Sequence, residues 1–256
     1  MGKIVAIVNQ KGGVGKTTSA VNLTAALGDQ HKKVLLVDID PQGNATSGMG
    51  IKKKGISSTY DLLIGEAAVD DVLVHTKYKH VDVLPSSIEL AGAEVEIVEM
   101  ENRVQLLKNQ LLGIKQNYDY ILIDCPPSLG LITLNALTAA DTFLVPIQCE
   151  YYALEGLSQL MATVRQVRRL YNENLELEGV LLTMFDGRLN LTMQVVTEVK
   201  KFFPKKVYKT VIPRNVRLSE APSFGEPVLY YDKSSKGTKA YNDLAKEFIK
   251  KNKSQS

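Results

Sequence analysis

Short apolar runs alternate with longer segments of helical period along the whole chain. The runs are rich in Val, Ile and Leu, and their continuity suits strands that are buried on both faces of a parallel sheet. Strand–helix alternation with right-handed crossovers predicts an α/β fold, a doubly wound, mostly parallel sheet with helices on both faces. The predicted strands are Ile4–Val8, Val34–Val37, Val81–Leu84, Tyr120–Ile123, Thr142–Ile147, Gly179–Met184 and Lys209–Ile212. The predicted helices are Lys16–Gln30, Ile88–Leu112, Leu131–Ala139, Leu154–Tyr171, Leu191–Phe203 and Lys236–Lys250.

This pattern continues without a break, which predicts a single domain over residues 1–256. No stretch rich in Pro, Gly and Ser interrupts it, and no internal repeat is found. A chain of 256 residues, 45% of them hydrophobic, can bury a sizeable core. The last residues, about 250–256, are basic and polar and are expected to form a flexible tail.

Bulk charge and cysteine content exclude few functions. The net charge of +3 is too small to indicate a nucleic-acid partner without a local basic patch. The two cysteines form no CxxC pair, so reduced thiols in a cytoplasmic protein are expected. The first apolar run is too short for a signal peptide or a membrane span, and Ala6 breaks the myristoylation pattern. The sequence thus predicts a cytoplasmic protein with no membrane partner.

A glycine-rich loop carries the clearest chemical pattern. It lies between the strand that ends at Val8 and the helix that begins near Lys16, which is the context of a phosphate-binding loop. Its glycines let backbone N–H groups point at phosphate oxygens, and the helix N-terminus adds positive potential. Lys16 is expected to reach the β- and γ-phosphates, and the Thr17 hydroxyl to bind Mg²⁺. The predicted ATP-binding residues are Lys11, Gly12, Gly13, Val14, Gly15, Lys16, Thr17 and Thr18.

This loop departs from the strict pattern GxxxxGK[ST]. Position 10, which should be glycine, is Gln10, and a second lysine, Lys11, stands five residues before Lys16. The alternative interpretation is a flexible glycine turn. The flanking strand and helix favour the phosphate-binding loop.

Two predicted strands end in carboxylates. Asp38 and Asp40 follow Val34–Val37, and alternation along an extended chain puts both on one side before the turn at Pro41. Two carboxylates this close repel each other unless a cation or a polarised water lies between them. One is therefore expected to complete a magnesium shell, and the other to orient an attacking water. The alternative for either residue is a capping role before the turn.

A third carboxylate, Asp124, follows the apolar strand Tyr120–Ile123, and two prolines end that strand. This is the position of the metal-side aspartate in a phosphate-loop NTPase. Thr17, Asp40 and Asp124 form the predicted magnesium site. The adjacent Cys125 is interpreted as a small buried hydrophobe rather than as a reactive thiol.

Together these motifs resemble the ParA/Soj branch of the deviant Walker A ATPases, also called the MinD/ParA group. The stretch IPRNVRLSEAPSFGEP is specific to the partitioning members of that group. The resemblance covers most of the chain. It includes Lys11–Thr18, Asp38–Asn44 with Thr46–Gly48, Asp124–Gly130, Glu150–Gly156 and Ile212–Pro227.

The resemblance implies a slow, magnesium-dependent ATP hydrolase that acts in chromosome or plasmid partitioning. In the family the extra lysine, here Lys11, contacts the ATP of the partner subunit in a nucleotide-sandwich homodimer. A cation supplied in this way stabilises charge on the transferring phosphoryl group, as an arginine finger does. Asp40 matches the residue that positions the attacking water, and Asp124 matches the Walker B aspartate. The expected catalytic residues are Lys11, Lys16 and Asp40.

The same resemblance implies which residues contact the adenine base and the ribose. Pro213 and Asn215 fall where the family closes over adenine and ribose. The segment Thr183–Asp186 lies near the usual base-contacting strand end, although an asparagine–lysine signature that reads the base is absent.

The resemblance also implies that the ATP-bound dimer coats DNA without sequence preference, at the nucleoid. Hydrolysis would be stimulated by a ParB-type centromere-binding protein. Basic side chains on one face of the dimer would contact phosphates, and binding would weaken steeply with salt. Arg188 and Arg217 match positions that the family uses for DNA. Further candidates, for which a solvated surface charge is the alternative, are Arg214, Lys200, Lys201, Lys205 and Lys206.

Two other classes of protein are weighed against this interpretation. A MinD-like ATPase is recruited to membranes by a C-terminal amphipathic helix, and such a stripe is present here, but it follows Lys236 without a linker, which favours docking on the sheet. An electron-transfer protein like the nitrogenase iron protein needs an exposed cysteine pair, and neither Cys125 nor Cys149 matches its placement. The residues of the C-terminal stripe are Tyr241, Leu244, Ala245, Phe248 and Ile249.

Overall fold

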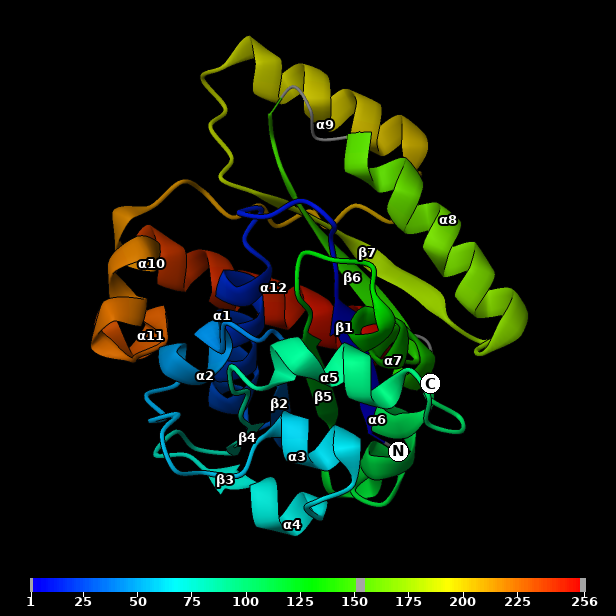
Figure 1. Cartoon of the computed structure of the whole chain (residues 1–256). Helices are drawn as coiled ribbons and strands as arrows, with labels where there is room; N and C mark the ends of the chain where they lie inside the picture. Colours follow the sequence, from blue (N-terminus) through cyan, green and yellow to red (C-terminus); the bar gives the residue numbers. More distant parts are fainter. Residues whose placement is uncertain (1, 151–154, 254–256) are drawn as a thin grey trace.

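The structure, a computed structural model, describes residues 2–150 and 155–253 (Figure 1). Its strands are β1 Lys3–Ile7, β2 Val34–Asp38, β3 Val74–His75, β4 Val81–Leu84, β5 Tyr120–Asp124, β6 Thr142–Gln148 and β7 Glu176–Thr183. Its α-helices are α1 Lys16–Asp29, α2 Asn44–Gly48, α3 Thr59–Ile64, α4 Val69–Val72, α5 Leu90–Ile97, α6 Leu106–Leu112, α7 Leu131–Ala139, α8 Glu155–Leu170, α9 Asn190–Phe202, α10 Val216–Glu220, α11 Val228–Tyr231 and α12 Lys236–Lys253. Two short 3-10 helices are η1 Lys115–Asn117 and η2 Ala221–Phe224.

The strands form one seven-stranded sheet in the order β3-β4-β2-β5-β1-β6-β7. All neighbouring pairs are parallel except β3 and β4. Because β5 lies between β1 and β2, its last residue, Asp124, stands opposite both Ile7 and Asp38. The three segments that follow these strands therefore begin side by side at the carboxyl edge of the sheet.

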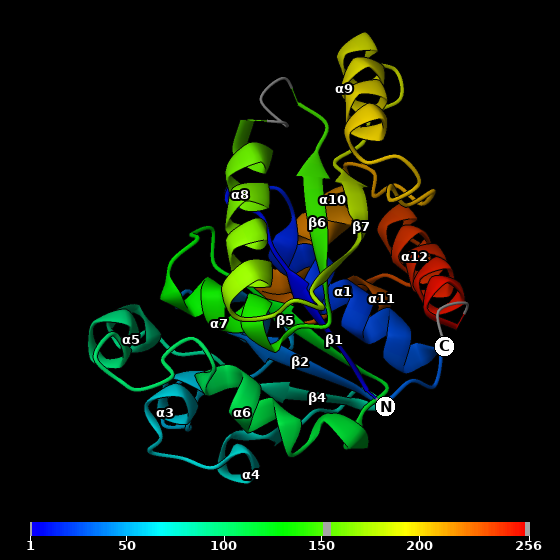
Figure 2. The same cartoon turned by 90° about the vertical axis from the view of Figure 1, so that its right-hand side faces the viewer.

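Helices cover both faces of this sheet, as predicted. Figure 2 shows α1 and α12 on one side of the strands and α7 and α8 on the other. Side chains alternate between two cores along β1: Ile4 and Ala6 belong to the core under α7 and α8, and Val5 and Ile7 to the core under α1 and α12. A strand buried on both faces would bury any polar side chain at a cost, which explains its continuous apolar run.

The C-terminal helix α12 packs in the core. Tyr241, Leu244 and Phe248 on its apolar stripe are at most 2% exposed, and the Tyr241 hydroxyl lies 3.2 Å from Ser19 Oγ on α1. The stripe is therefore docked, as the sequence interpretation favoured. The helix runs to Lys253, and residues 254–256 of the expected tail lie outside the described residues. Asn252 is buried and donates to Glu178 Oε1 at 3.1 Å, which holds the last turn on the sheet.

The predicted strand Lys209–Ile212 is wrong. This segment follows the outer edge of β7, and only the isolated bridges Val180–Val207 and Phe185–Pro213 flank it. The carboxylate of Glu247 on α12 accepts hydrogen bonds from the backbone N–H groups of Lys209 and Thr210, both at 2.9 Å. These donors are therefore not available to a sheet ladder, because a side chain distant in sequence takes them.

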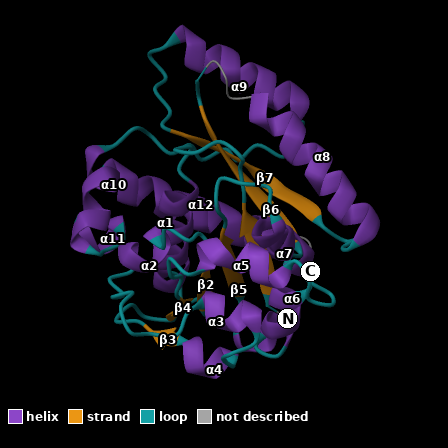
Figure 3. Cartoon of the chain, in the orientation of Figure 1, coloured by secondary structure: helices purple, strands orange, loops and turns teal. Residues whose placement is uncertain are grey.

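The predicted single helix Ile88–Leu112 is also wrong. Figure 3 shows α5 and α6 as separate helices. Between them Asn102 adopts a left-handed conformation with φ of 54°, which interrupts a right-handed helix. The side chain of Asn135 on α7 then accepts from Leu107 N–H at 3.2 Å and donates to the Arg103 carbonyl at 2.7 Å, which fixes the break. The two-residue strand β3 was not predicted, because so short a strand has no readable period.

Candidate nucleotide site

The glycine-rich loop connects β1 to α1 in the conformation that its sequence predicts. Gly13 and Gly15 have φ of 73° and 85°, and Gly15 is the N-cap of α1. Around Gly12 and Gly13 the space is open: a Cβ atom on either would meet nothing within 4 Å. Asn9 fixes the start of the loop, since its side chain accepts from Lys11 N–H at 3.0 Å and donates to the Pro146 carbonyl at 2.8 Å. The loop is thus anchored at its base and open where a ligand would approach.

The two lysines of the loop point to different places. Lys16 is only 6% exposed, and its Nζ donates to the Lys11 carbonyl at 3.2 Å, inside the loop. Burial lowers the pKa of Lys16, while the negative charges of Asp124 and Asp40 oppose that shift. Lys11 Nζ lies outside the loop, 3.8 Å from Glu150 Oε2, and the same carboxylate stands 3.8 Å from the Arg214 guanidinium.

The Glu150 contact was missed at the sequence level. Its side chain is about half exposed, at 49%. Exposed ion pairs of this kind are worth roughly 0–1 kcal/mol, so Lys11 can leave Glu150 at little cost. Glu150 entered the sequence analysis only as the first residue of the family stretch 150–156, and residues 151–154 of that stretch lie outside the described residues. No local pattern could have indicated its partners.

The end of β7 closes one side of the loop. Thr183 Oγ1 donates to the Val14 carbonyl at 2.8 Å, and the Phe185 N–H donates to the Ile212 carbonyl at 2.9 Å. Through these bonds the segments 183–186 and 212–215 meet beside the phosphate loop. Asn215 Oδ1 is buried and has no hydrogen-bond partner among the described residues. A buried amide oxygen without a donor is suited to a ligand that supplies one, so Pro213 and Asn215 stand where nucleoside contacts are predicted.

Asp38 stabilises the turn that follows β2 through hydrogen bonds. Its Oδ2 accepts from both the N–H and the hydroxyl of Thr46 at 2.7 Å, and its Oδ1 accepts from Asp40 N–H at 3.1 Å. Burial raises the pKa of Asp38 to about 6, and the bonds from Thr46 oppose the shift. Because both oxygens are occupied, the capping role holds for Asp38.

Asp40 is left with free coordinating capacity. It is 7% exposed, and its Oδ1 accepts from Gln42 N–H at 3.0 Å. Its carbonyl accepts from Ser86 Oγ at 2.7 Å, so the backbone is fixed on both sides of the side chain. Its Oδ2 accepts no hydrogen bond within residues 2–150 and 155–253. Of the pair, Asp40 is thus the carboxylate that can act on a water or a cation.

Asp124 fits the predicted metal-side role. It is fully buried, and neither of its carboxylate oxygens has a hydrogen-bond partner in the described part of the chain. Burial and the nearby charge of Asp38 raise the pKa of Asp124, and the positive charge of Lys16 opposes this shift. A buried carboxylate without donors is strongly stabilised by a cation.

The donor set suits Mg²⁺ bound mainly through substrate and water. No group of three or more His, Cys, Asp or Glu residues that could hold a metal occurs in the described ranges. Mg²⁺ uses one or two protein ligands together with phosphate oxygens and waters, which agrees with a hydroxyl and a carboxylate at Thr17 and Asp124.

The two cysteines are both buried. Burial raises the pKa of the Cys125 thiol, and it raises that of Cys149 to about 11. Both thiols are therefore protonated and shielded. This contradicts the exposed pair that an intersubunit iron–sulfur cluster needs.

The two arginines predicted to bind DNA are exposed and already paired. Arg188 follows β7, and its side chain is 87% exposed; its guanidinium donates twice to Asp186, at 2.8 and 2.6 Å, which holds the pKa of Asp186 down to about 2. Arg217 on α10 is 50% exposed and lies 2.7 Å from Glu220 and 3.3 Å from Asp232. Both remain accessible to a phosphate that displaces a carboxylate.

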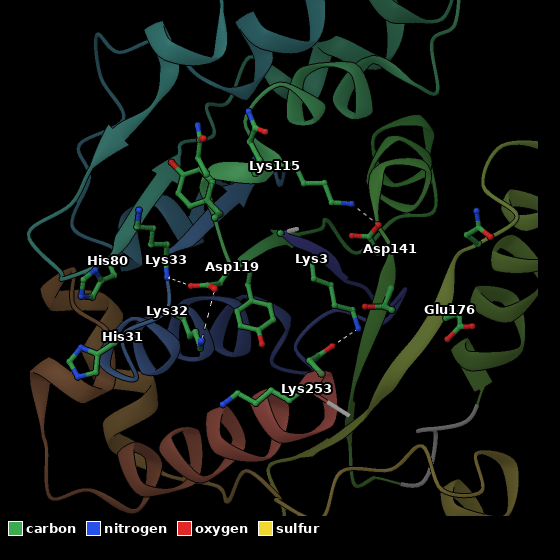
Figure 4. A pocket seen from close by; sticks show the side chains of 18 residues that line it. Lys3, His31, Lys32, Lys33, His80, Lys115, Asp119, Asp141, Glu176 and Lys253 are labelled. Carbon is green, nitrogen blue, oxygen red and sulfur yellow. Dashed lines mark hydrogen bonds and ion pairs between the residues drawn. The ribbon is translucent and has the colours of Figure 1, made fainter. Parts of the chain in front are cut away.

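One cavity lies away from the glycine-rich loop. It has a volume of about 1120 Å³ and is lined at the opposite edge of the sheet by the first residues of β1, β5 and β6 (Figure 4). Several of its cations are neutralised: Lys115 lies 2.7 Å from Asp141, and Lys3 lies 2.6 Å from Glu178. This cavity lies at the opposite edge of the sheet from the predicted phosphate site. The unsatisfied groups Asp124 and Asn215 mark the other one.

Comparison with known proteins identifies the family. A sequence profile of the family described as "AAA domain" matches residues 2–177. The "Sporulation initiation inhibitor protein Soj" of Bacillus subtilis (strain 168) is 62% identical over 248 residues, which are 96% of this chain and 98% of the relative. The "Chromosome partitioning protein ParA" of Myxococcus xanthus (strain DK1622) is 52% identical over 257 residues, covering 100% of this chain and 91% of the relative. The chain belongs to the ParA/Soj family of chromosome-partitioning ATPases.

A solved structure supports the ATPase fold of this ParA/Soj chain. The structure, from Mycobacterium smegmatis and described as "Cobyrinic Acid a,c-diamide synthase" with bound ATP analogue and magnesium, superposes with a TM-score of 0.88 at 35% identity. It covers 100% of this chain and 98% of its own. The ligands of that structure agree with the ATP and magnesium that the sequence predicts. No helix in residues 2–150 and 155–253 is long and apolar enough to cross a membrane.

Proposed function

We propose that this ParA/Soj-family protein is a magnesium-dependent ATPase of one domain, slow on its own, that dimerises around ATP and binds DNA. The observation that carries the proposal is that the two loop lysines make different contacts. Lys16 Nζ lies inside the phosphate loop, whereas Lys11 Nζ lies outside it against Glu150. A lysine held outside its own loop by an exposed pair is available to the phosphates of a second subunit.

The proposed chemistry follows from the groups at the carboxyl edge. Lys16 and the backbone N–H groups of residues 12–18 neutralise the phosphates, and Thr17 and Asp124 hold Mg²⁺. Mg²⁺ supplies positive charge on the phosphate oxygens. Asp40, whose Oδ1 is fixed by Gln42 N–H, orients the attacking water with its other oxygen. Lys11 of the opposite subunit stabilises charge on the transferring phosphoryl group, so hydrolysis and dimerisation depend on each other.

The DNA contact is proposed for Arg188 and Arg217, at the nucleoid in the cytoplasm. Both guanidiniums are exposed, and both stand on segments that follow or flank the nucleoside-facing residues 183–186 and 212–215. Phosphates would displace Asp186 and Glu220 from these arginines, which gives binding without base contacts and a strong salt dependence. A ParB-type protein is the proposed partner that stimulates hydrolysis and resets the dimer. The names of the relatives support this partitioning role.

Size-exclusion chromatography with Mg·ATP tests the scheme on wild type and on Asp40→Ala, with and without DNA. Asp40→Ala is expected to accumulate as an ATP-dependent dimer that retains DNA, because ATP is bound but not turned over. Wild type should return to monomer as ATP is consumed. A monomer under all conditions would refute the sandwich dimer, and a dimer that leaves DNA unbound would refute the DNA role. Co-sedimentation with liposomes in ATP would instead support the MinD-like alternative.

A further inference from the structure

Three consecutive lysines, Lys52, Lys53 and Lys54, form an exposed loop between α2 and α3. None of the three forms an ion pair within residues 2–150 and 155–253, so the loop carries three uncompensated positive charges. We call this segment the lysine loop. Exposed lysines are ordinarily solvated, but one of these makes a specific contact with the turn that carries Asp40.

Lys53 holds the turn Asp40–Gly43 from outside. Its Nζ donates to the Gln42 carbonyl at 2.6 Å. The N–H of the same peptide unit, that of Gly43, donates to the Asp40 carbonyl at 2.8 Å. A cation on the carbonyl side polarises the peptide and strengthens the bond on its N–H side. The neighbouring N–H, that of Gln42, fixes Asp40 Oδ1 at 3.0 Å, so the lysine acts on the turn that sets the carboxylate.

Gly43 leaves room for this contact because it has no Cβ atom. The Lys53 stem crosses it so closely that a Cβ atom would lie 2.7 Å from Lys53 Cδ and 3.1 Å from Nζ. Gly43 also has φ of 58°, which favours glycine. The backbone is thus open for the lysine stem at the one position where it passes.

The residues just before the lysine loop pack against the segment that carries the DNA candidate Arg217. Gly50, two residues before Lys52, packs backbone to backbone on Gly225: a Cβ on Gly50 would lie 2.8 Å from the Gly225 carbonyl oxygen. Both glycines have positive φ, of 78° and 64°. This close approach fixes the start of the lysine loop against the end of η2, in the stretch 212–227.

We propose that Lys53 is a positioning residue for Asp40, and that nucleic-acid phosphates on Lys52 and Lys54 hold it in place. The second half rests on the proposed function. Three adjacent like charges repel one another, and this repulsion loosens the loop and with it the Lys53–Gln42 bond. Phosphates of a DNA backbone that bridge Lys52 and Lys54 remove the repulsion. DNA binding is thereby linked to the geometry of the hydrolytic carboxylate.

Steady-state hydrolysis of Mg·ATP tests the positioning role without DNA. Lys53→Met keeps the stem over Gly43 but removes the donor, and kcat is expected to fall about threefold to tenfold with KM unchanged, which is the size expected for the loss of one exposed hydrogen bond. Lys53→Arg should restore kcat. The matched control Lys79→Met removes an exposed lysine outside the lysine loop and should leave kcat unchanged. An unaltered Lys53→Met, a rise in KM alone, or equal losses in Lys79→Met would overturn the inference.

A second arm adds a short DNA duplex. Wild-type kcat is expected to rise with DNA at low salt, and this rise should be lost in Lys53→Met and in the double variant Lys52→Met/Lys54→Met. Inorganic phosphate at the same phosphate concentration should have no effect, because a single ion cannot bridge the loop. The same rise with inorganic phosphate would overturn the nucleic-acid assignment. Failure of the wild type to bind DNA would contradict the proposed function. If DNA raises kcat equally in the wild type and in Lys53→Met, only this inference is contradicted.

Discussion

Replacing Glu178 by Gln removes one charge from the buried cluster that fastens α12 to the sheet. The Glu178 side chain is 3% exposed. Its Oε2 accepts from Lys3 Nζ at 2.6 Å and from Thr142 Oγ1 at 2.9 Å. Its Oε1 accepts from Asn252 Nδ2 at 3.1 Å and from the Tyr208 hydroxyl at 3.2 Å. All four partners are donors at these contacts, so the amide group of a glutamine must face at least one donor with its own N–H groups.

The size of the effect follows from these contacts. The variant loses an ion pair and the two bonds to one oxygen, and hydrogen bonds to charged groups contribute about 1.5–3 kcal/mol each. Lys3 retains 19% exposure, so water compensates part of the loss. We expect Glu178→Gln to lower the free energy of unfolding by about 3 kcal/mol, in the range known for broken buried pairs.

Urea denaturation followed by circular dichroism measures this change. Glu176→Gln, at the exposed first residue of the same strand, is the matched control and should shift the free energy of unfolding by less than about 0.5 kcal/mol. ATP binding should survive in both variants, since the cluster lies at the opposite edge of the sheet from the phosphate loop. A loss below about 1 kcal/mol in Glu178→Gln would refute the reasoning, because it would mean that the cluster adds nothing beyond an exposed pair.

The pH dependence gives a second check on Glu178. Burial by itself raises the pKa of this carboxyl, but the hydrogen bonds from Lys3, Thr142 and Asn252 prevail and hold its pKa below the usual value. Such a group adds stability above its unfolded pKa, about 4.3, and that stability is lost as the pH falls through the folded value. The stability difference between wild type and Glu178→Gln should therefore be full at pH 7 and shrink below about pH 4.3. A difference that does not change with pH would contradict this assignment.

Three further predictions concern the nucleotide and DNA sites. Lys11→Ala should retain ATP binding and lose ATP-dependent dimerisation in analytical ultracentrifugation; loss of ATP binding itself would place Lys11 in its own subunit's site. Thr183→Val leaves the Val14 carbonyl without its 2.8 Å donor, and a fluorescent ATP analogue should bind about threefold to tenfold more weakly; unchanged affinity would show that the bond does not hold the loop. Arg217→Ala should abolish DNA retention at low salt while sparing ATP binding, with the exposed Arg169→Ala on α8 as control; normal retention on DNA would exclude Arg217 from the interface.

Much of the candidate site could be predicted from the sequence, because its signals are local. The phosphate loop needs only glycines between a strand and a helix, and Lys11–Thr18 supplies them within eight residues. The carboxylates after β2 and β5 lie at one edge because parallel strands end at the same edge of a sheet. The register that sets Asp38 opposite Asp124 bears this out.

The different roles of Asp38 and Asp40 were not readable from the sequence. Both follow the same strand, and either one could have been the cap. The choice depends on Thr46, whose N–H and hydroxyl saturate Asp38 after the chain has turned back through α2. The contact between Glu150 and Lys11 was not readable either, because it arises only from the pairing of β6 with β1 in the sheet.

The sequence by itself determined which segments are strands and helices wherever period and composition are strong, and it determined the residues of the phosphate loop. The tertiary structure decided the remainder through groups far apart in the chain. Glu247 takes the amides that would have made Lys209–Ile212 a strand, and Asn135 holds the break between α5 and α6. A local pattern sets what a segment prefers, but a buried donor or acceptor must be satisfied by whichever partner the fold brings to it. That partner is known only once the chain is folded.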